Sequence, residues 1–266
     1  MHASLALGLA YHRYRNGATT SHHRSEEYYH WTRSAALLKK RLDQPIETKD
    51  KDPIWGTAAT LALLSFSFTD TDLPHQSWPV QVPSENSPDP LDWLRMDNAK
   101  MSLWHIVNPL RPESIFSIMK NTYAQLASPL PKSGAKDIPG PLASLCGLVG
   151  HSTAENNPYF SAAHAISQLL EVEDSRVTVG QTQRFTKCIH GAFESLLRAR
   201  DPIALLLLYI WYSKAGRSIW WIKSRARVER PAIRLYLQRI CGEHEKIQKC
   251  LVADLPTCGG FLTTLG

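Results

Sequence analysis

The longest uninterrupted apolar stretch of the chain runs from Pro202 to Tyr212, and it constrains the fold more than any other feature. Its eleven residues are too few to cross a bilayer, which takes about 20 apolar residues in a helix. A helix that is apolar all round is typical of a protein interior. The chain has 266 residues, of which 43% are hydrophobic, so it is long enough and apolar enough to bury such a helix in a sizeable core.

Apolar residues recur at helical spacing along most of the chain, and no segment alternates in the manner of a β-strand bounded by hairpin turns. The predicted helices cover residues 1–14, 25–42, 53–68, 91–106, 111–126, 142–149, 158–171, 178–199, 202–215, 217–240 and 242–253. Two long proline-rich loops, 70–90 and 129–141, separate them. We therefore expect an all-α fold: a single compact multi-helix domain over residues 1–266, with 129–141 as the boundary if there are two.

Capping residues predict where two of these helices begin. Ser25 is followed by Glu26 and Glu27, which places an N-cap ahead of acidic side chains in the first helical turn. Asp52 followed by Pro53 predicts an N-cap and a proline at the first helical position. We expect the helix after Pro53 to be buried on most sides, because few of its residues are polar.

The formal net charge of +6 is unevenly distributed. Residues 1–41 carry seven Lys and Arg against two Glu, and residues 184–239 carry twelve against three acids, so the rest of the chain is acidic. Between Lys223 and Arg227 the cations follow each other at i, i+2 and i+4, which spreads them around a helix and argues against one flat phosphate-binding face. The pattern favours solvated helix faces, or a basic face for a partner, over direct contact with nucleic acid.

The sequence lacks the motifs that are typical of common catalytic and metal-binding sites. It has no C-x-x-C pair and no G-x-S-x-G turn, and the adjacent His22 and His23 lack the i, i+4 spacing of two ligands on one helix face. The acidic clusters at 70–72 and 171–174 are typical of solvated or capping residues. We expect no catalytic residue, no metal site, no cofactor and no membrane span. An odd number of cysteines without a secretory signal predicts an intracellular setting.

Aromatic residues are the most informative candidates for a binding site. Trp93 and Trp104 lie eleven residues apart on one predicted helix, a spacing that returns them to the same face after three turns. Most such rings pack in a core, yet an all-α domain rich in Trp and Leu can also enclose a flat hydrophobic ligand. The predicted ligand-binding residues are Trp93, Trp104, Tyr209, Trp211 and Tyr212.

Two regions of the chain resemble a known family. They contain, in order, DPLDWLRM at 89–96, KMSLW at 100–104, NPLRP at 108–112, then RDPIALLLL at 200–208, WW at 220–221, Glu229 and LYL at 235–237. The opening HASLAL at 2–7 and the segment 52–68 fit the same order. These segments are similar to the middle and C-terminal regions of fungal zinc-cluster transcription factors of the sterol-uptake-control type.

The resemblance implies an all-helical regulatory and effector-binding domain, sterol-sensing in some members, in the nucleus or cytoplasm. Family members bind DNA through an N-terminal binuclear zinc cluster held by six cysteines, whereas no cysteine of this sequence precedes Cys146. We therefore expect no direct DNA binding by this chain. The resemblance implies binding of a hydrophobic, sterol- or terpenoid-like small molecule, pairing with a second copy or a related transcription factor, or both. The alternative is a stand-alone enzyme on the same scaffold that folds or cyclises an apolar substrate in secondary metabolism.

Overall fold

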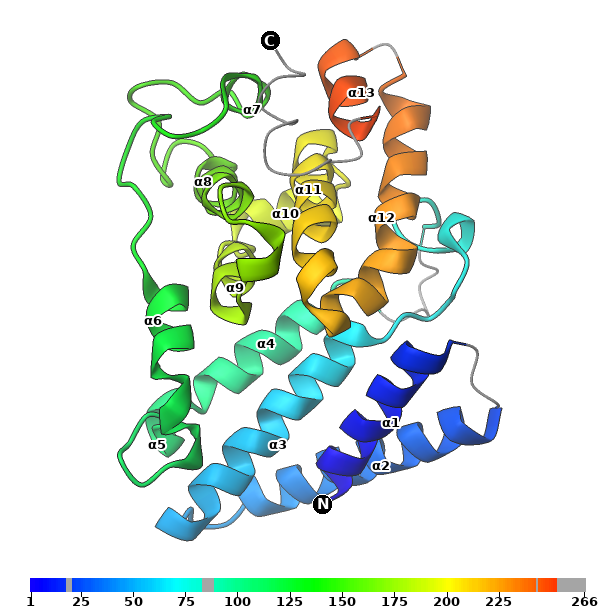
Figure 1. The fold of residues 1–266 in the computed structure, drawn as a ribbon, viewed down its shortest axis with the longest axis vertical. Helices are drawn as coiled ribbons and strands as arrows, with labels where there is room; N and C mark the ends of the chain where they lie inside the picture. The colour runs from blue at the N-terminus through cyan, green and yellow to red at the C-terminus, as the bar shows by residue number, and fades with distance from the viewer. Residues whose placement is uncertain (18–20, 83–88, 243, 253–266) are drawn as a thin grey trace. The chain divides into compact units, whose positions relative to one another are not determined.

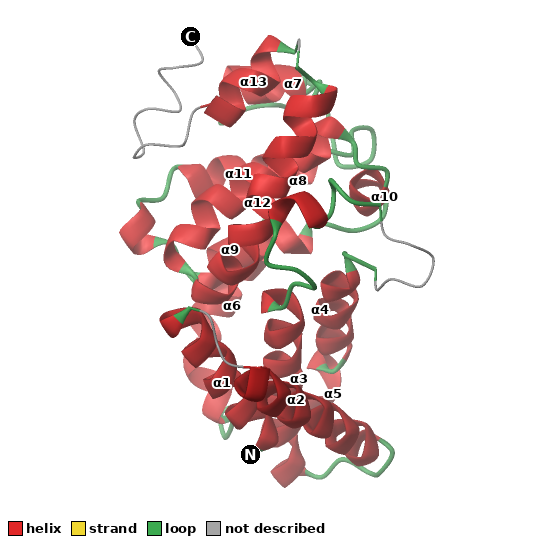
Figure 2. Ribbon diagram, turned by 90° about the vertical axis from the view of Figure 1, so that its right-hand side faces the viewer, coloured by secondary structure: helices red, strands yellow, loops and turns green. Residues whose placement is uncertain are grey.

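The computed structural model describes residues 1–17, 21–82, 89–242 and 244–252. Every regular element in these ranges is helical (Figure 2), which confirms the all-α prediction. The chain divides into two compact units, Met1–Phe68 with Pro88–Asn121 and Thr69–Ser87 with Thr122–Gly266. The segment 129–141 lies inside the second unit, and a single domain over the whole chain stays a prediction. No helix of the described ranges has the length and apolar content needed to cross a membrane.

The first unit is built on three long helices. Its elements are α1 (His2–Asn16), α2 (Ser21–Leu42), α3 (Thr48–Ser67), α4 (Asp92–Ser102), α5 (Trp104–Val107), the 3₁₀ turn η2 (Ile115–Met119) and the start of α6 (Lys120–Ala127). Figure 1 shows α1 and α2 running alongside α3. The buried face of α1 consists of Ala3, Ala6 and Ala10, whose small side chains let the helix backbones approach closely.

The second unit surrounds α11 (Pro202–Ser218). Its other elements are η1 (Pro74–Gln76), the rest of α6, α7 (Gly140–Leu145), α8 (Phe160–Leu170), η3 (Asp174–Arg176), α9 (Val179–Lys187), α10 (Ala192–Arg198), α12 (Trp220–Ile240) and α13 (Glu245–Val252). Every residue of α11 from Ala204 to Gly216 is buried, as the apolar run predicts. Asp201 caps this helix by accepting hydrogen bonds from the backbone N–H groups of Ile203 and Ala204.

The predicted start of α3 was wrong. The helix begins at Thr48, behind a capping box in which Glu47 and Asp50 satisfy each other's backbone N–H groups, and Pro53 lies inside the helix. Asp52 is not a cap, because its carboxylate accepts hydrogen bonds from Arg111, Ser114 and the backbone of Ile115. A tertiary interaction therefore uses the side chain that the local pattern assigned to helix capping.

Three predicted helices are each divided in two. Residues 91–106 form α4 and α5, and Asn108 then ends α5 in the left-handed region, with φ of 40°. The helix predicted over 111–126 consists of η2 followed by α6. The one predicted over 178–199 consists of α9 and α10, separated by Gly191 with φ of 56°. Helix α2 begins four residues before its predicted cap, at Ser21.

Candidate functional site

The five predicted ligand-binding residues lie in different units. The first unit holds two of them on two helices and the second holds three on α11: Trp93, Trp104, Tyr209, Trp211 and Tyr212. Trp93 lies on α4 and Trp104 on α5, so the two tryptophans are not on one continuous helix as predicted. Neither unit by itself therefore assembles all five rings around one ligand.

The two tryptophans of the first unit are engaged in ring packing. The Trp93 ring lies edge-to-face against Phe66, with 4.8 Å between centroids. The Trp104 ring makes the same kind of contact with Trp55 at 5.4 Å. Such pairs stabilise a fold by about 0.5–1.5 kcal/mol beyond the area they bury. Both residues therefore help to hold α4 and α5 against α3.

The rings of α11 are buried and their polar atoms are bonded. Trp211 stacks on Phe185 at 5.3 Å, and its indole Nε1 donates to the carbonyl of Thr182 at 3.0 Å. The Tyr209 hydroxyl donates to the carbonyl of Leu251 at 3.4 Å. Buried Tyr and Trp side chains need such partners, and here other parts of the same unit supply them. These contacts make the rings part of the core of the second unit, and their role in ligand binding stays a prediction.

A buried charge network that the sequence analysis missed joins α11 to α12. The Tyr212 hydroxyl donates to the Glu229 carboxylate at 2.6 Å, and Arg225 donates to its other oxygen. Burial raises the pKa of Glu229, while Arg225 and the Tyr212 hydrogen bond favour its charged form. Glu229 is only 3% exposed, so its carboxylate lies inside the helix pair and not at its surface. The i, i+4 spacing of Arg225 and Glu229 was visible in the sequence, but their burial was not.

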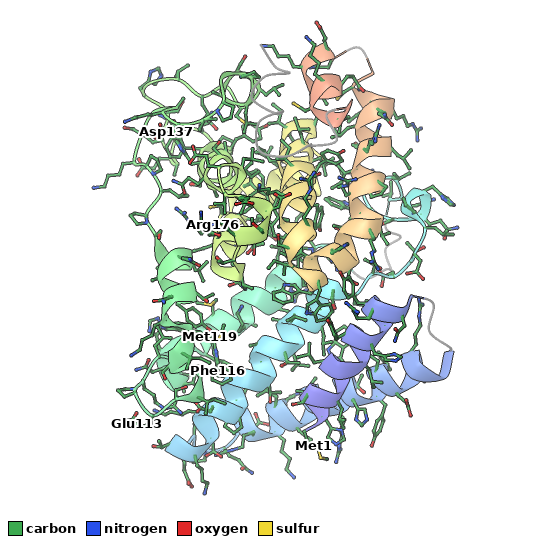
Figure 3. All side chains as sticks on the ribbon, in the orientation of Figure 1. Met1, Glu113, Phe116, Met119, Asp137 and Arg176 are labelled. Carbon is green, nitrogen blue, oxygen red and sulfur yellow. The ribbon has the colours of Figure 1, made fainter. Side chains whose placement is uncertain are left out.

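A pocket of about 170 Å³ opens in the first unit where α1, α2 and α3 meet. Its walls are largely apolar, with Leu37 and Leu38 from α2, and Pro53 and Ile54 from α3. The beginning of α1 completes it, at the position of Met1 in Figure 3. A concave, mostly apolar site with a few polar groups is the usual form of a small-molecule site.

An ion pair provides the polar end of this pocket. Arg41, in the last turn of α2, donates to the carboxylate of Asp50 and to the carbonyl of Pro45. Asp50 also accepts the backbone N–H of Glu47 at 3.0 Å, so it belongs to the capping box of α3. The hydrogen bond from Arg41 holds the pKa of Asp50 below its ordinary value. A cation and an anion are thus fixed beside apolar walls.

His2 adds a titratable group to the edge of the pocket. Its Nδ1 lies 2.7 Å from the Nδ1 of His30, which links α1 to α2. Desolvation lowers the pKa of His2, and the nearby charges of His30 and Arg33 lower it further. A hydrogen bond between two imidazoles requires that at least one of them is neutral, which the depressed pKa favours.

The predicted acidic cluster at 171–174 and the partly buried Cys188 both belong to the second unit. Asp174 forms ion pairs with Lys214 and Arg217, both at 2.7 Å. The Cys188 thiol donates to the carbonyl of Arg184, and burial raises its pKa to about 11, which disfavours a reactive thiolate. The side chains of His22 and His23 lie outside the described residues.

Within the described ranges, no group of three His, Cys, Asp or Glu residues is arranged to hold a metal ion. Comparison with models of protein families, with curated proteins and with solved structures found no match to this chain. The pocket between α1, α2 and α3 and the sequence resemblance are therefore the two features that bear on function.

Proposed function

We propose that this chain is a regulatory domain of the kind found in fungal zinc-cluster transcription factors, and that it binds a compact, mostly apolar small molecule in the pocket between α1, α2 and α3. The observation that carries the proposal is a set of apolar walls next to the fixed Arg41–Asp50 pair. The walls favour an apolar ring, and the pair offers both donors and an acceptor to one polar group on it.

The size of the pocket narrows the class of ligand. An apolar cavity of about 150 Å³ holds one benzene molecule, whereas pockets for drug-sized ligands measure about 300–1,000 Å³. At about 170 Å³, the pocket accommodates a compact ring system with a small polar group. A whole sterol exceeds this volume. The proposed ligand is therefore smaller than the sterol-like molecule that the family resemblance implies.

A ligand in this position can act on the packing of three helices at once. The pocket takes side chains from α1, α2 and α3, so a bound molecule stabilises the arrangement in which all three converge. A ligand shifts a conformational equilibrium only by its difference in affinity for the two states. The regulatory output in this proposal is a change in how α1 and α2 pack on α3, which alters the surface that they present to a partner.

The experiment is calorimetric titration of the full chain with indole and with benzyl alcohol, and with ergosterol in detergent as the large comparison ligand. A Thr57→Phe variant fills the pocket, and Thr60→Phe places the same ring three residues further along α3, at a position that does not line the pocket. The proposal expects at least one small ring to bind wild type and Thr60→Phe, and Thr57→Phe to lose that binding. Binding that survives Thr57→Phe, or no binding of either ring, contradicts the proposal.

A further inference from the structure

Helix α12 carries four cations along a single face. Lys223, Arg227, Arg230 and Arg234 follow one another at spacings of four, three and four residues. At 3.6 residues per turn they fall within an arc of about 60° and extend over about 16 Å of the helix. Lys223 and Arg227 are exposed, and Arg230 and Arg234 are half-buried. We call these four side chains the cation row.

The cations of α12 share one face because one arginine among them is buried, although their spacing in the sequence suggests that they spread around the helix. The spacing of Lys223, Arg225 and Arg227 predicted cations on several sides of the helix. Arg225 lies in the core against Glu229, so its charge is removed from the surface. The remaining cations then share one face.

The acid of the same helix does not neutralise the row. Glu229 is the one carboxylate between Trp220 and Ile240, and it is buried against Arg225 and Tyr212. Among the described residues, no carboxylate lies within 4.0 Å of the side-chain nitrogens of Lys223 or Arg234. Lys223 and Arg234, at the two ends of the row, therefore carry positive charge that no carboxylate within 4.0 Å in the described part of the chain neutralises.

Contacts with α11 hold the middle of the row in place. The Arg230 guanidinium lies 5.6 Å above the centre of the Tyr209 ring, and its NH1 donates to the Ser213 hydroxyl at 3.2 Å. A side chain that is already ordered loses less conformational entropy when it binds a partner. Arg230 is thus pre-positioned, with Lys223 and Arg234 on either side of it along the helix.

We infer that the cation row is a docking surface for an acidic α-helix of a partner protein, a function separate from the small-molecule pocket. A helix with carboxylates at the same spacing of four, three and four residues places its own charges in one row of matching length. The Tyr209 ring is buried beneath Arg230 and so is not available to stack on a nucleic acid base.

The test measures fluorescence anisotropy of two labelled, alanine-based peptides of identical composition with the full chain. One peptide carries glutamates at the spacing of the row, and the other distributes them around its helix. The row-spaced peptide is expected to bind at least about fivefold more tightly, and to weaken between about 50 mM and about 300 mM NaCl as salt screens the charges. Equal binding of the two peptides overturns the proposal.

Variants of the chain identify the surface that binds. The double reversal Lys223→Glu/Arg234→Glu is expected to weaken the row-spaced peptide at least about tenfold, and the milder Lys223→Gln/Arg234→Gln severalfold. Arg239→Glu, on the same helix but outside the row, is the matched control and is expected to leave binding within about twofold. If the reversed variant is unfolded by circular dichroism, the glutamine variant decides. The proposal is overturned if the folded variant binds the peptide as tightly as wild type. It is also overturned if single- or double-stranded DNA binds more tightly than the peptide and this binding depends on the row.

Discussion

The two units bury their helices in different ways. In the second unit α11 is buried on every side, and its internal polar groups, Tyr212 among them, are hydrogen-bonded within the unit. In the first unit the described side chains of α2, residues 24–42, include only two buried ones, Glu27 and Ser34, while Tyr28 is 64% exposed. Segments with few buried apolar contacts open at lower free-energy cost than core helices. The low burial of α2 fits the ligand-binding role that we propose for the first unit, while α11 is the best-buried helix of the second.

Breaking the buried pair of the second unit is expected to have the largest effect. Arg225→Ala leaves the Glu229 carboxylate buried without its cation, and such a loss costs about 3–5 kcal/mol in the free energy of unfolding. Urea denaturation measures it. The double variant Arg225→Met/Glu229→Leu is expected to recover part of that stability, because it removes both charges but leaves the Tyr212 hydroxyl without its acceptor. If Arg225→Ala unfolds at the wild-type urea concentration, the second unit does not depend on this network.

The second largest loss of stability is expected where α9 closely approaches α6. A Cβ added at Gly180 would lie 2.3 Å from the backbone carbonyl oxygen of Thr122, so Gly180→Ala is expected to force the two helices apart. Overpacking of this kind costs about 1–3 kcal/mol in the free energy of unfolding. Gly140→Ala is the matched control, since nothing lies within 4 Å of its Cβ position. Equal thermal midpoints for the two variants argue against this helix contact.

Asp52→Ala tests how the first unit is held together. Its carboxylate fixes the segment before η2 by accepting from Arg111 at 2.6 Å, Ser114 at 2.8 Å and the backbone of Ile115 at 3.0 Å. Phe116, labelled in Figure 3, then packs on α3 at Gly56. Loss of these bonds costs about 1–3 kcal/mol, and hydrogen exchange of the Ile115 amide should accelerate.

The exposed pair of Asp92 with Arg95 provides the control for that variant. Asp92→Ala is expected to change the free energy of unfolding by less than about 1 kcal/mol, as is usual for surface ion pairs. If the Ile115 amide is equally protected from exchange in Asp52→Ala and Asp92→Ala, the role assigned to Asp52 is contradicted.

The smallest expected difference between the units is their response to acid. The pKa values of Asp50 and Asp52 lie below the ordinary 3.8, so the stability they contribute is present above that value and is lost as the pH falls through their folded pKa values. In the second unit Asp174 behaves in the same way. Glu229 has the opposite effect on the acid response of the second unit. Its pKa is raised above 4.5, so the stability that it contributes is fully present below pH 4.5 and is lost as the pH rises through its folded pKa.

Hydrogen exchange between pH 6 and pH 3 measures this difference, once corrected for the intrinsic effect of pH on exchange. Protection in α2 and α3 is expected to fall before protection in α11 and α12. The reverse order contradicts the assignment of these shifts to the two units.

The sequence predicts the fold class well because helical periodicity and the apolar run at 202–212 depend on local spacing. It fails at helix boundaries where a distant residue competes for a capping side chain, as Arg111 does for Asp52. The site is harder to predict. The pocket arises from the convergence of three helices, and nothing in the local sequence distinguishes Thr57, which lines it, from Thr60.

Aromatic residues at regular spacing do not by themselves locate a binding site. Trp93 and Trp104 are on separate helices, and Trp211 has its indole bonded inside the core. Periodic aromatic residues predict burial, but burial is common to core residues and to residues around a ligand. Only the three-dimensional packing of each ring separates the two.

The most direct test of the central claim is a methyl NMR titration of the full chain, labelled at Ile and Leu, with indole. A ligand in the pocket between α1, α2 and α3 is expected to shift the methyl signals of Leu37, Leu38 and Ile54 in a saturable way. The signals of Leu205, Leu206 and Leu207, fully buried in α11, are expected to stay unchanged. Saturable shifts confined to α11, or no saturable shift at Leu37, Leu38 and Ile54, contradict the account.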